Sequence, residues 1–217
     1  MKGLLIKDLL CLKNYKKSFI VSLVMAGFIG FVDSEVGNVI GIVTIMFGFM
    51  FSAISTSTFA YDELSNSEKY ILTLPVSKKD ILLSKYIFSI LCLLCGILMG
   101  MILGSILTLT LNGKIINLDS DLSTIMGGFI VCSFMLCIQI PCIYKYGVEK
   151  GRVQALIFMT LIISVIIGIY FLLNKIGIIF DFSNFGNYFV IVFLIISVFM
   201  YYISFIISKK IYYKKEL

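Results

Sequence analysis

Long apolar runs separated by short charged segments make up almost the whole chain. A helix needs about 20 apolar residues to cross a hydrocarbon core of about 30 Å. The apolar residues follow one another without the alternation of a membrane β-barrel strand, so helices are the structures that satisfy the backbone in lipid. The pattern predicts an all-α integral membrane protein with six transmembrane helices, over 18–32, 36–61, 86–113, 122–144, 153–174 and 182–208.

Basic residues gather in the segments on one side of these six spans. The amino-terminal segment, segments 62–85 and 145–152 and the carboxy-terminal tail hold 16 of the 18 Lys and Arg residues. The opposite connections hold only Lys114 and Lys175. Because Lys and Arg are enriched in cytoplasmic loops, we expect a multi-pass protein of the cell membrane with both termini in the cytoplasm. The bias also supports an even number of spans.

Residues 1–17 precede the first span and carry their own amphipathic pattern. Met1, Leu5, Leu9 and Leu12 recur at helical spacing, and Lys7 lies roughly opposite them. This spacing predicts a helix lying in the membrane interface; a frayed basic tail is the alternative. The whole chain, 1–217, is then a single transmembrane domain.

Composition agrees with this architecture and narrows the chemistry. Hydrophobic residues make up 60% of the chain and charged residues 14%, whereas soluble domains carry about 25% charged residues. The formal charge of +6 lies on lysines that flank spans, where they set topology and meet anionic lipid rather than nucleic acid. The chain has no His, which removes most metal-hydrolase and Ser-His chemistry. Cys92 and Cys95 form a CxxC inside an apolar span, where cysteine behaves as a small hydrophobe.

Segment 62–85, DELSNSEKYILTLPVSKKDILLSK, is the most informative part of the chain. The second span is expected to continue as a helix through Asp62 and Glu63, and Pro75 breaks the helical pattern. Ser77 with Asp80 three residues later predicts a capping box that starts the next helix. The amphipathic string between these helices is open to two interpretations: a connector that rests on lipid headgroups, or a docking element for a cytoplasmic partner.

The layout and the segment FAYDELSNSEKYILTLPVSKKDILLSKY resemble the permease subunits of type-2 ABC exporters. The closest likeness is to small permeases of Gram-positive bacteria, such as those that export phenol-soluble modulins or other amphipathic peptides. The resemblance implies that the loop carries a coupling helix for a separate ABC ATPase, present in two copies. It also implies a second permease subunit, with a homodimer expected. The residues implied in ATPase coupling are Asp62, Glu63, Glu68, Lys69, Tyr70 and Leu72.

The sequence contains no Walker A pattern, GxxxxGK[ST]. The chain is therefore predicted to be a non-catalytic subunit that binds no cofactor itself, with ATP and magnesium on the partner ATPase. The spans as delimited contain no charged residue. Because charges retained at mid-bilayer usually mark ion or proton paths, their absence favours a hydrophobic or amphipathic substrate, a peptide or a drug.

Small and polar residues inside the spans predict where helices pack and which side chains line a translocation route. Gly96, Gly100 and Gly104 form a doubled GxxxG, which predicts close packing against a neighbouring span of the same subunit. Pro141 is expected to free a carbonyl within the fourth span. Five residues are weaker candidates for lining the route, with bonding to their own helix as the alternative: Ser52, Ser55, Gln154, Thr160 and Ser164.

The predicted function is a membrane-spanning permease subunit of an ATP-driven exporter. An ATP-independent channel or carrier is one alternative, and it would carry charged or strongly polar residues at mid-span. An intramembrane enzyme would need a convergent set of catalytic groups. A membrane scaffold that binds a partner through the same loop is the third alternative.

Overall fold

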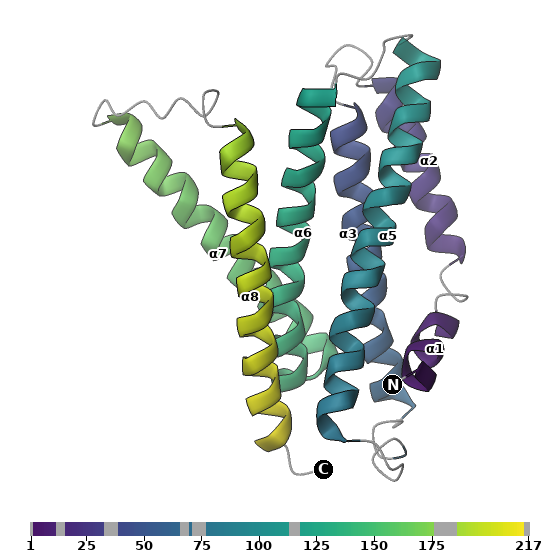
Figure 1. Cartoon of the computed structure of the whole chain (residues 1–217), viewed down its shortest axis with the longest axis vertical. Coiled ribbons are helices and arrows are strands. Elements are labelled where there is room, and N and C mark those ends of the chain that lie inside the picture. The colour runs from purple at the N-terminus through teal and green to yellow at the C-terminus, as the bar shows by residue number, and fades with distance from the viewer. Residues whose placement is uncertain are drawn as a thin grey trace.

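The computed structural model describes residues 2–11, 16–32, 39–65, 70, 77–112, 118–175 and 186–214. These residues are helical almost throughout, as predicted. Figure 1 shows α3, α5 and α6 standing beside one another, with α1 and α2 on one flank and α8 on the other. The helices are α1 (Lys2–Cys11), α2 (Lys16–Val32), α3 (Val39–Leu64), α5 (Lys78–Asn112), α6 (Leu118–Tyr146), α7 (Val148–Lys175) and α8 (Gly186–Lys214).

Four helices have described residues that are long and apolar enough to cross a membrane: Val39–Leu64, Lys78–Thr110, Thr124–Tyr146 and Leu194–Lys214. The prediction of a multi-pass membrane protein is supported by these four. Helix α2 adds a shorter apolar stretch, Phe19–Phe28. Since α2 and α7 are not among the four, the count of six spans stays a prediction.

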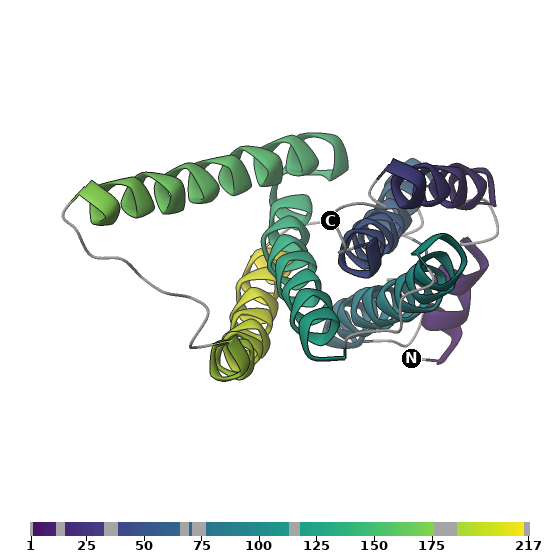
Figure 2. The same ribbon diagram turned by 90° about the horizontal axis from the view of Figure 1, so that it is seen from above.

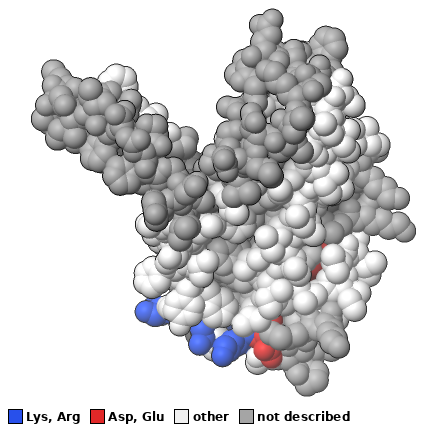
Figure 3. Space-filling model, turned by 45° about the horizontal axis from the view of Figure 1, so that its top comes forward, with Lys and Arg blue, Asp and Glu red and all other residues white. Residues whose placement is uncertain are grey.

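Both termini lie at one end of the bundle, together with α1, the last turn of α3 and the turn between α6 and α7 (Figure 1). We call this end the basic end. The Lys and Arg side chains visible in Figure 3 gather there, beside a small group of Asp and Glu side chains. Termini at the same end are what an even number of crossings produces.

Helices α3 and α5 form the most extensive helix pair, and glycines of α5 make the close approach possible. A Cβ at Gly100 would lie 2.6 Å from Thr44 Cα, and one at Gly104 would lie 3.0 Å from Ile40 Cα. Gly96 is equally crowded by α3. Only a residue without a side chain allows the two backbones to meet at this distance. The predicted packing within one subunit is confirmed.

The helix ends on either side of the informative loop are also as predicted. Helix α3 runs to Leu64 and so includes Asp62 and Glu63. Ser77 precedes the first residue of α5, and its Oγ accepts from the Asp80 N–H at 3.2 Å and donates to the Asp80 carboxylate at 2.7 Å. The bond from the Asp80 N–H is the N-cap half of the predicted capping box, and the Asp80 carboxylate binds the Ser77 hydroxyl instead of the Ser77 N–H. Pro75 lies outside the described residues.

Pro141 inside α6 explains how α8 is attached to the bundle. Proline has no N–H, so the carbonyl of Cys137, four residues earlier, loses its helical partner. Ser204 of α8 donates to that carbonyl at 2.7 Å. The Tyr86 hydroxyl of α5 donates to Ser204 at 2.8 Å and accepts from Ser208, also at 2.8 Å. A chain of hydrogen bonds thus joins α5, α6 and α8 in otherwise apolar surroundings.

Helix α7 leaves the bundle at an angle, as Figures 1 and 2 show. It contacts α6, and it contacts α3 less extensively. Beyond its first turns, the described apolar side chains are about half exposed, including Leu156 at 51% and Ile163 at 53%. Within this chain, the apolar surface of α7 beyond those turns remains largely uncovered.

Candidate functional site

Four charged side chains join α1, α3 and α5 at the basic end. The Nζ of Lys85 in α5 lies 2.8 Å from Oδ1 of Asp8 in α1 and 2.6 Å from Oδ2 of Asp62 in α3. Lys7 forms a second ion pair with Asp62. We call these residues the ion cluster. Its two carboxylates and two ammonium groups balance in charge, which is how ionised groups are retained away from water.

Three members of the ion cluster are buried, and the Lys7 side chain is partly exposed. Asp8 is 1% exposed, Lys85 6% and Asp62 7%. Thr58 accepts from Lys85 at 3.3 Å, and the Lys85 Nζ lies 5.1 Å from the centre of the Phe59 ring. Burial raises the pKa of Asp8 above its usual value of 3.8, and the charge and hydrogen bond of Lys85 oppose that rise. The ammonium of Lys85 therefore favours the ionised form of the Asp8 carboxylate.

The ion cluster holds the two helices that flank the loop after α3. Asp62 stands two residues before the end of α3, and Lys85 stands in the second turn of α5. Their contact is 2.6 Å long, so the two ends of the loop are fixed to each other and to α1. The ion cluster therefore links α1, α3 and α5.

Glu63, the next residue of α3, reaches in a different direction. Successive helical residues point about 100° apart, and Glu63 meets the start of α7 while Asp62 meets α1 and α5. Its Oε2 accepts from the Val148 N–H at 2.9 Å. A carboxylate at a helix amino terminus satisfies a free N–H and complements the helix dipole. Gly147 makes the preceding turn, with a φ of 83° that favours glycine.

A second contact between α3 and α7 lies further from the basic end, one turn along α7 from the first. Arg152 of α7 donates to Ser57 Oγ at 3.0 Å. Beside these contacts is a groove of about 460 Å³. It is lined by Ala60, Glu63, Leu64, Tyr146, Gly147, Val148, Glu149, Lys150 and Arg152. The last turns of α3 therefore touch both halves of the basic end: α1 and α5 on one side, and α7 on the other.

The residues predicted to couple to an ATPase fall into three groups. Asp62 is buried in the ion cluster, so any part it has in coupling acts through helix packing and not through direct contact with a partner. Glu63 is exposed beside the start of α7, and Tyr70 is 73% exposed. Glu68, Lys69 and Leu72 lie outside the described residues. The coupling role of this set stays a prediction.

The residues predicted to line a route lie on two helices, Ser52 and Ser55 on α3 and Gln154, Thr160 and Ser164 on α7. Ser52 and Ser55 are buried, 0% and 1% exposed, and Ser52 donates to its own helix at Phe49. Thr160 and Ser164 also bond within α7, at 2.9 and 2.8 Å. These bonds within the helix are the alternative that the sequence left open.

Two buried oxygens among these residues find no hydrogen-bond partner within the described part of the chain: Ser55 Oγ and Gln154 Oε1. Ser55 belongs to α3 and Gln154 to α7. Unpaired polar atoms are unusual in a packed interior. They are the best remaining support for a role of α3 and α7 in the route, which stays a prediction.

Sequence reasoning missed Asp8 and Lys85 as site residues and treated Lys7 only as the polar side of an interfacial helix. The signal was present in LLIKDLLCL, where a carboxylate interrupts a leucine-rich helix. A charge in such a position needs a partner of opposite sign. The sequence does not say which of many lysines is that partner, because the choice depends on how α1 packs.

Comparison with known proteins identifies one family. The model of the ABC-2 family transporter proteins matches residues 3–213, which is almost the whole chain. No curated protein and no solved structure matches the chain significantly.

Proposed function

Because the chain belongs to the ABC-2 transporter family, we propose that it is the membrane-spanning permease subunit of an ATP-driven exporter. The motor is a separate ABC ATPase, which binds ATP and magnesium. The absence of a Walker A pattern from the sequence supports a motor on another chain. In this proposal the basic end faces the cytoplasm, in keeping with the side on which Lys and Arg gather.

The loop between α3 and α5 is the proposed coupling element, in residues 62–74. The observation that carries this part of the proposal is the ion cluster, which fixes both helices that flank the loop. When two ATPase subunits close on ATP, they would push on the loop. Because α1, α3 and α5 are joined by buried ion pairs, they move as one body, and Glu63 extends the motion to the start of α7. The route then changes its access from one side of the membrane to the other.

Two permease subunits are proposed to pair, as a homodimer. The support is the exposed apolar surface of α7, where described side chains such as Leu156, Ile157 and Ile163 are 51–53% exposed. A symmetric pair would cover this surface on both copies. The test is a scan of single cysteines over 156–165 in membranes, with Phe199→Cys on α8 as a matched control that is 63% exposed. Cross-linking at every third or fourth position of α7 is expected; cross-linking only at the control would refute the α7 interface.

The proposed substrate is hydrophobic or amphipathic, and a peptide of the phenol-soluble-modulin kind is the favoured class. The spans as delimited in the sequence carry no charged residue that would bind a fixed counter-charge. In vesicles containing the permease and its ATPase, an amphipathic helical peptide should stimulate ATP hydrolysis. A scrambled peptide of the same composition is the control. Equal stimulation by both, or stimulation by a small hydrophilic ion alone, would rule out this substrate class.

The experiment that tests the function itself is co-purification from native membranes. An ATPase should accompany the wild-type chain and be lost when Glu68, Tyr70 and Leu72 are replaced by alanine. Glu63 and Asp62 stay unchanged, because their hydrogen bonds are part of the fold. The matched control replaces Lys114, Ile115 and Ile116, which connect α5 to α6 in the sequence, by alanine. If no ATPase accompanies the wild type, the exporter proposal fails; if the loop variant retains it, the docking surface lies elsewhere.

A further inference from the structure

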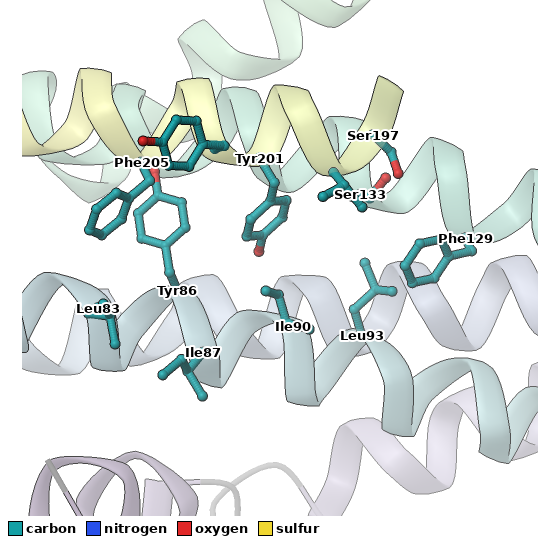
Figure 4. Close-up of a pocket in the computed structure, with 12 residues that line it drawn as sticks. Leu83, Tyr86, Ile87, Ile90, Leu93, Phe129, Ser133, Ser197, Tyr201 and Phe205 are labelled. Atoms are coloured by element: carbon teal, nitrogen blue, oxygen red, sulfur yellow. The ribbon is translucent and has the colours of Figure 1, made fainter. Parts of the chain in front are cut away.

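An apolar groove runs between α5 and α8 on the outside of the bundle. Figure 4 shows the residues of α5 and α8 that form its two sides. Its volume is about 460 Å³, which falls in the usual range of about 300–1,000 Å³ for ligand sites. Val198 and Tyr202 on its α8 side are 69% and 63% exposed, and Ile90 on its α5 side is 40% exposed, so the groove opens to the surroundings.

Four hydroxyl groups that line the groove, those of Tyr86, Ser133, Ser197 and Tyr201, are already engaged. Tyr86 bonds to Ser204 and Ser208, and Tyr201 bonds to Ser89 at 2.6 Å. The Ser133 and Ser197 hydroxyls each donate to a carbonyl of their own helix, at 2.7 and 2.8 Å. These hydroxyl groups already have hydrogen-bond partners and do not require a polar ligand. The groove therefore offers an apolar surface to its occupant.

The length of the groove matches one leaflet of a bilayer. Along α5 it extends from Leu83 to Leu93, and ten residues of helix rise about 15 Å. Half of a hydrocarbon core of about 30 Å is the same length. Leu83 is close to the basic end and Leu93 is near the middle of the helix. An acyl chain of the leaflet on that side would fill the groove from end to end.

Helical spacing places two lysines near the end of the groove that is closer to the basic end. Lys79 precedes Leu83 by four residues in α5, and Lys209 follows Phe205 by four residues in α8, so each shares a helix face with the groove. In α5, four residues rise about 6 Å, which places Lys79 beyond the Leu83 end of the groove. Lys209 directly follows Ser208, which bonds to Tyr86, so Lys209 starts closer to the groove, and its long side chain can extend toward the headgroups. The Nζ of Lys209 lies 5.9 Å from the centre of the Tyr213 ring, further toward the basic end. Among the described residues, neither lysine forms an ion pair.

We propose that the α5–α8 groove is a binding site for an anionic phospholipid, whose acyl chain lies against Leu83–Leu93 and whose phosphate is held by Lys79 and Lys209. Charge complementarity selects the headgroup, and the apolar length selects the chain. The lipid would cover the side of α8 that faces α5. Hydrogen bonds from Tyr86 to Ser204 and Ser208 hold this side toward α5. This proposal does not depend on the transported substrate or on the ATPase.

The test measures lipid retention by the purified protein with native mass spectrometry. Phosphatidylglycerol is compared with phosphatidylcholine of identical acyl chains, and glycerol phosphate is added as a headgroup without chains. Wild type should retain phosphatidylglycerol preferentially, and glycerol phosphate should not displace it. Lys79→Gln with Lys209→Gln should weaken phosphatidylglycerol binding about 30-fold and leave phosphatidylcholine unchanged, since each lysine near an anionic lipid contributes about fivefold.

Three further variants decide between this site and general attraction to a basic surface. Lys145→Gln with Lys150→Gln removes the same charge from the other side of the basic end and should change binding less than twofold. Ile90→Trp fills the groove and should weaken both lipids. Lys79→Arg with Lys209→Arg keeps the charge and should preserve the preference. The proposal is overturned if both double glutamine variants lose binding equally, or if Ile90→Trp retains phosphatidylglycerol as well as wild type does.

Discussion

Replacing Lys85 by methionine tests whether the ion cluster holds the basic end together. The substitution keeps a long side chain and removes the ammonium that lies between Asp8 and Asp62. Asp62 retains its ion pair with Lys7. Asp8, which is 1% exposed, keeps no ion-pair partner among the described residues. The variant therefore leaves one buried carboxylate uncompensated.

The loss of folding stability in Lys85→Met can be calculated in two ways. Breaking a buried ion pair by removing one partner costs about 3–5 kcal/mol. Alternatively, the protein can protonate Asp8. From the usual pKa of 3.8, protonation at pH 7.5 costs about 5 kcal/mol, at about 1.4 kcal/mol per pH unit, and this sets an upper limit. For a chain of this length each kcal/mol lowers the melting temperature by about 2–4 °C, so the expected loss is on the order of 10 °C.

The chain has no Trp, so buried cysteines are the better reporter of unfolding. Cys92, Cys132 and Cys137 are buried and free. A maleimide dye that fluoresces on reaction will follow their exposure as the protein is heated in detergent or nanodiscs. Lys85→Met should melt well below wild type. Adding Asp8→Asn removes the uncompensated charge and should restore most of the loss.

The loss in Lys85→Met should also depend on pH. Without Lys85, the folded-state pKa of Asp8 rises further above its unfolded value, because Lys85 is the main influence that lowers it. The folded state then binds a proton that the unfolded state releases, so stability falls as pH rises above the unfolded pKa. Melting near pH 5.5 should be closer to wild type than melting at pH 7.5. If Lys85→Met melts with wild type, or if Asp8→Asn restores nothing, the cluster does not have the stabilising role argued from its geometry.

Three further substitutions test the packing. Gly100→Leu places a side chain where a Cβ alone would lie 2.6 Å from α3, and it should lower the melting temperature severely. Gly127→Leu is the control, because nothing lies within 4 Å of a Cβ at that position. Equal melting temperatures of the two variants would refute the close approach. Ser204→Ala leaves a buried carbonyl without a donor at a cost of about 1–3 kcal/mol, and adding Pro141→Ala supplies the missing N–H, so the double variant should be more stable than Ser204→Ala in the same assay; no recovery would contradict the link to α8. Glu63→Ala removes the acceptor of the first N–H of α7, and hydrogen exchange at that amide should rise about fivefold for a bond worth about 1 kcal/mol; unchanged protection would show that the bond does not hold the turn.

The sequence predicted those structural features that depend on residues close to one another along the chain. The capping box of Ser77 and Asp80 and the carbonyl freed by Pro141 were predicted, because each involves residues within four positions of one another. The three glycines of α5 predicted a close approach, because a backbone without side chains has this use in lipid. The sequence did not show that Ser204, 67 residues away, would donate to the carbonyl that Pro141 leaves free.

The candidate site itself depended on contacts between distant residues. Lys85 was counted as a topology signal, yet it is 77 residues from the Asp8 carboxylate that it binds. The coupling role of Asp62 stays a prediction, and the sequence did not show that this residue is buried, because the face of α3 that carries it packs against α1 and α5. Helical periodicity places a residue on a face, but it does not say which neighbour covers that face.

The sequence by itself determined that this is an all-α membrane protein, because about 20 apolar residues in lipid must satisfy their backbone internally whatever lies beside them. Only the tertiary structure decided which charges become buried pairs, which helix keeps an uncovered apolar surface and where a groove remains between α5 and α8. These are properties of helix packing. They arise from the relative positions of segments far apart in the chain, and lipid, being as apolar as the helices, does not impose those positions.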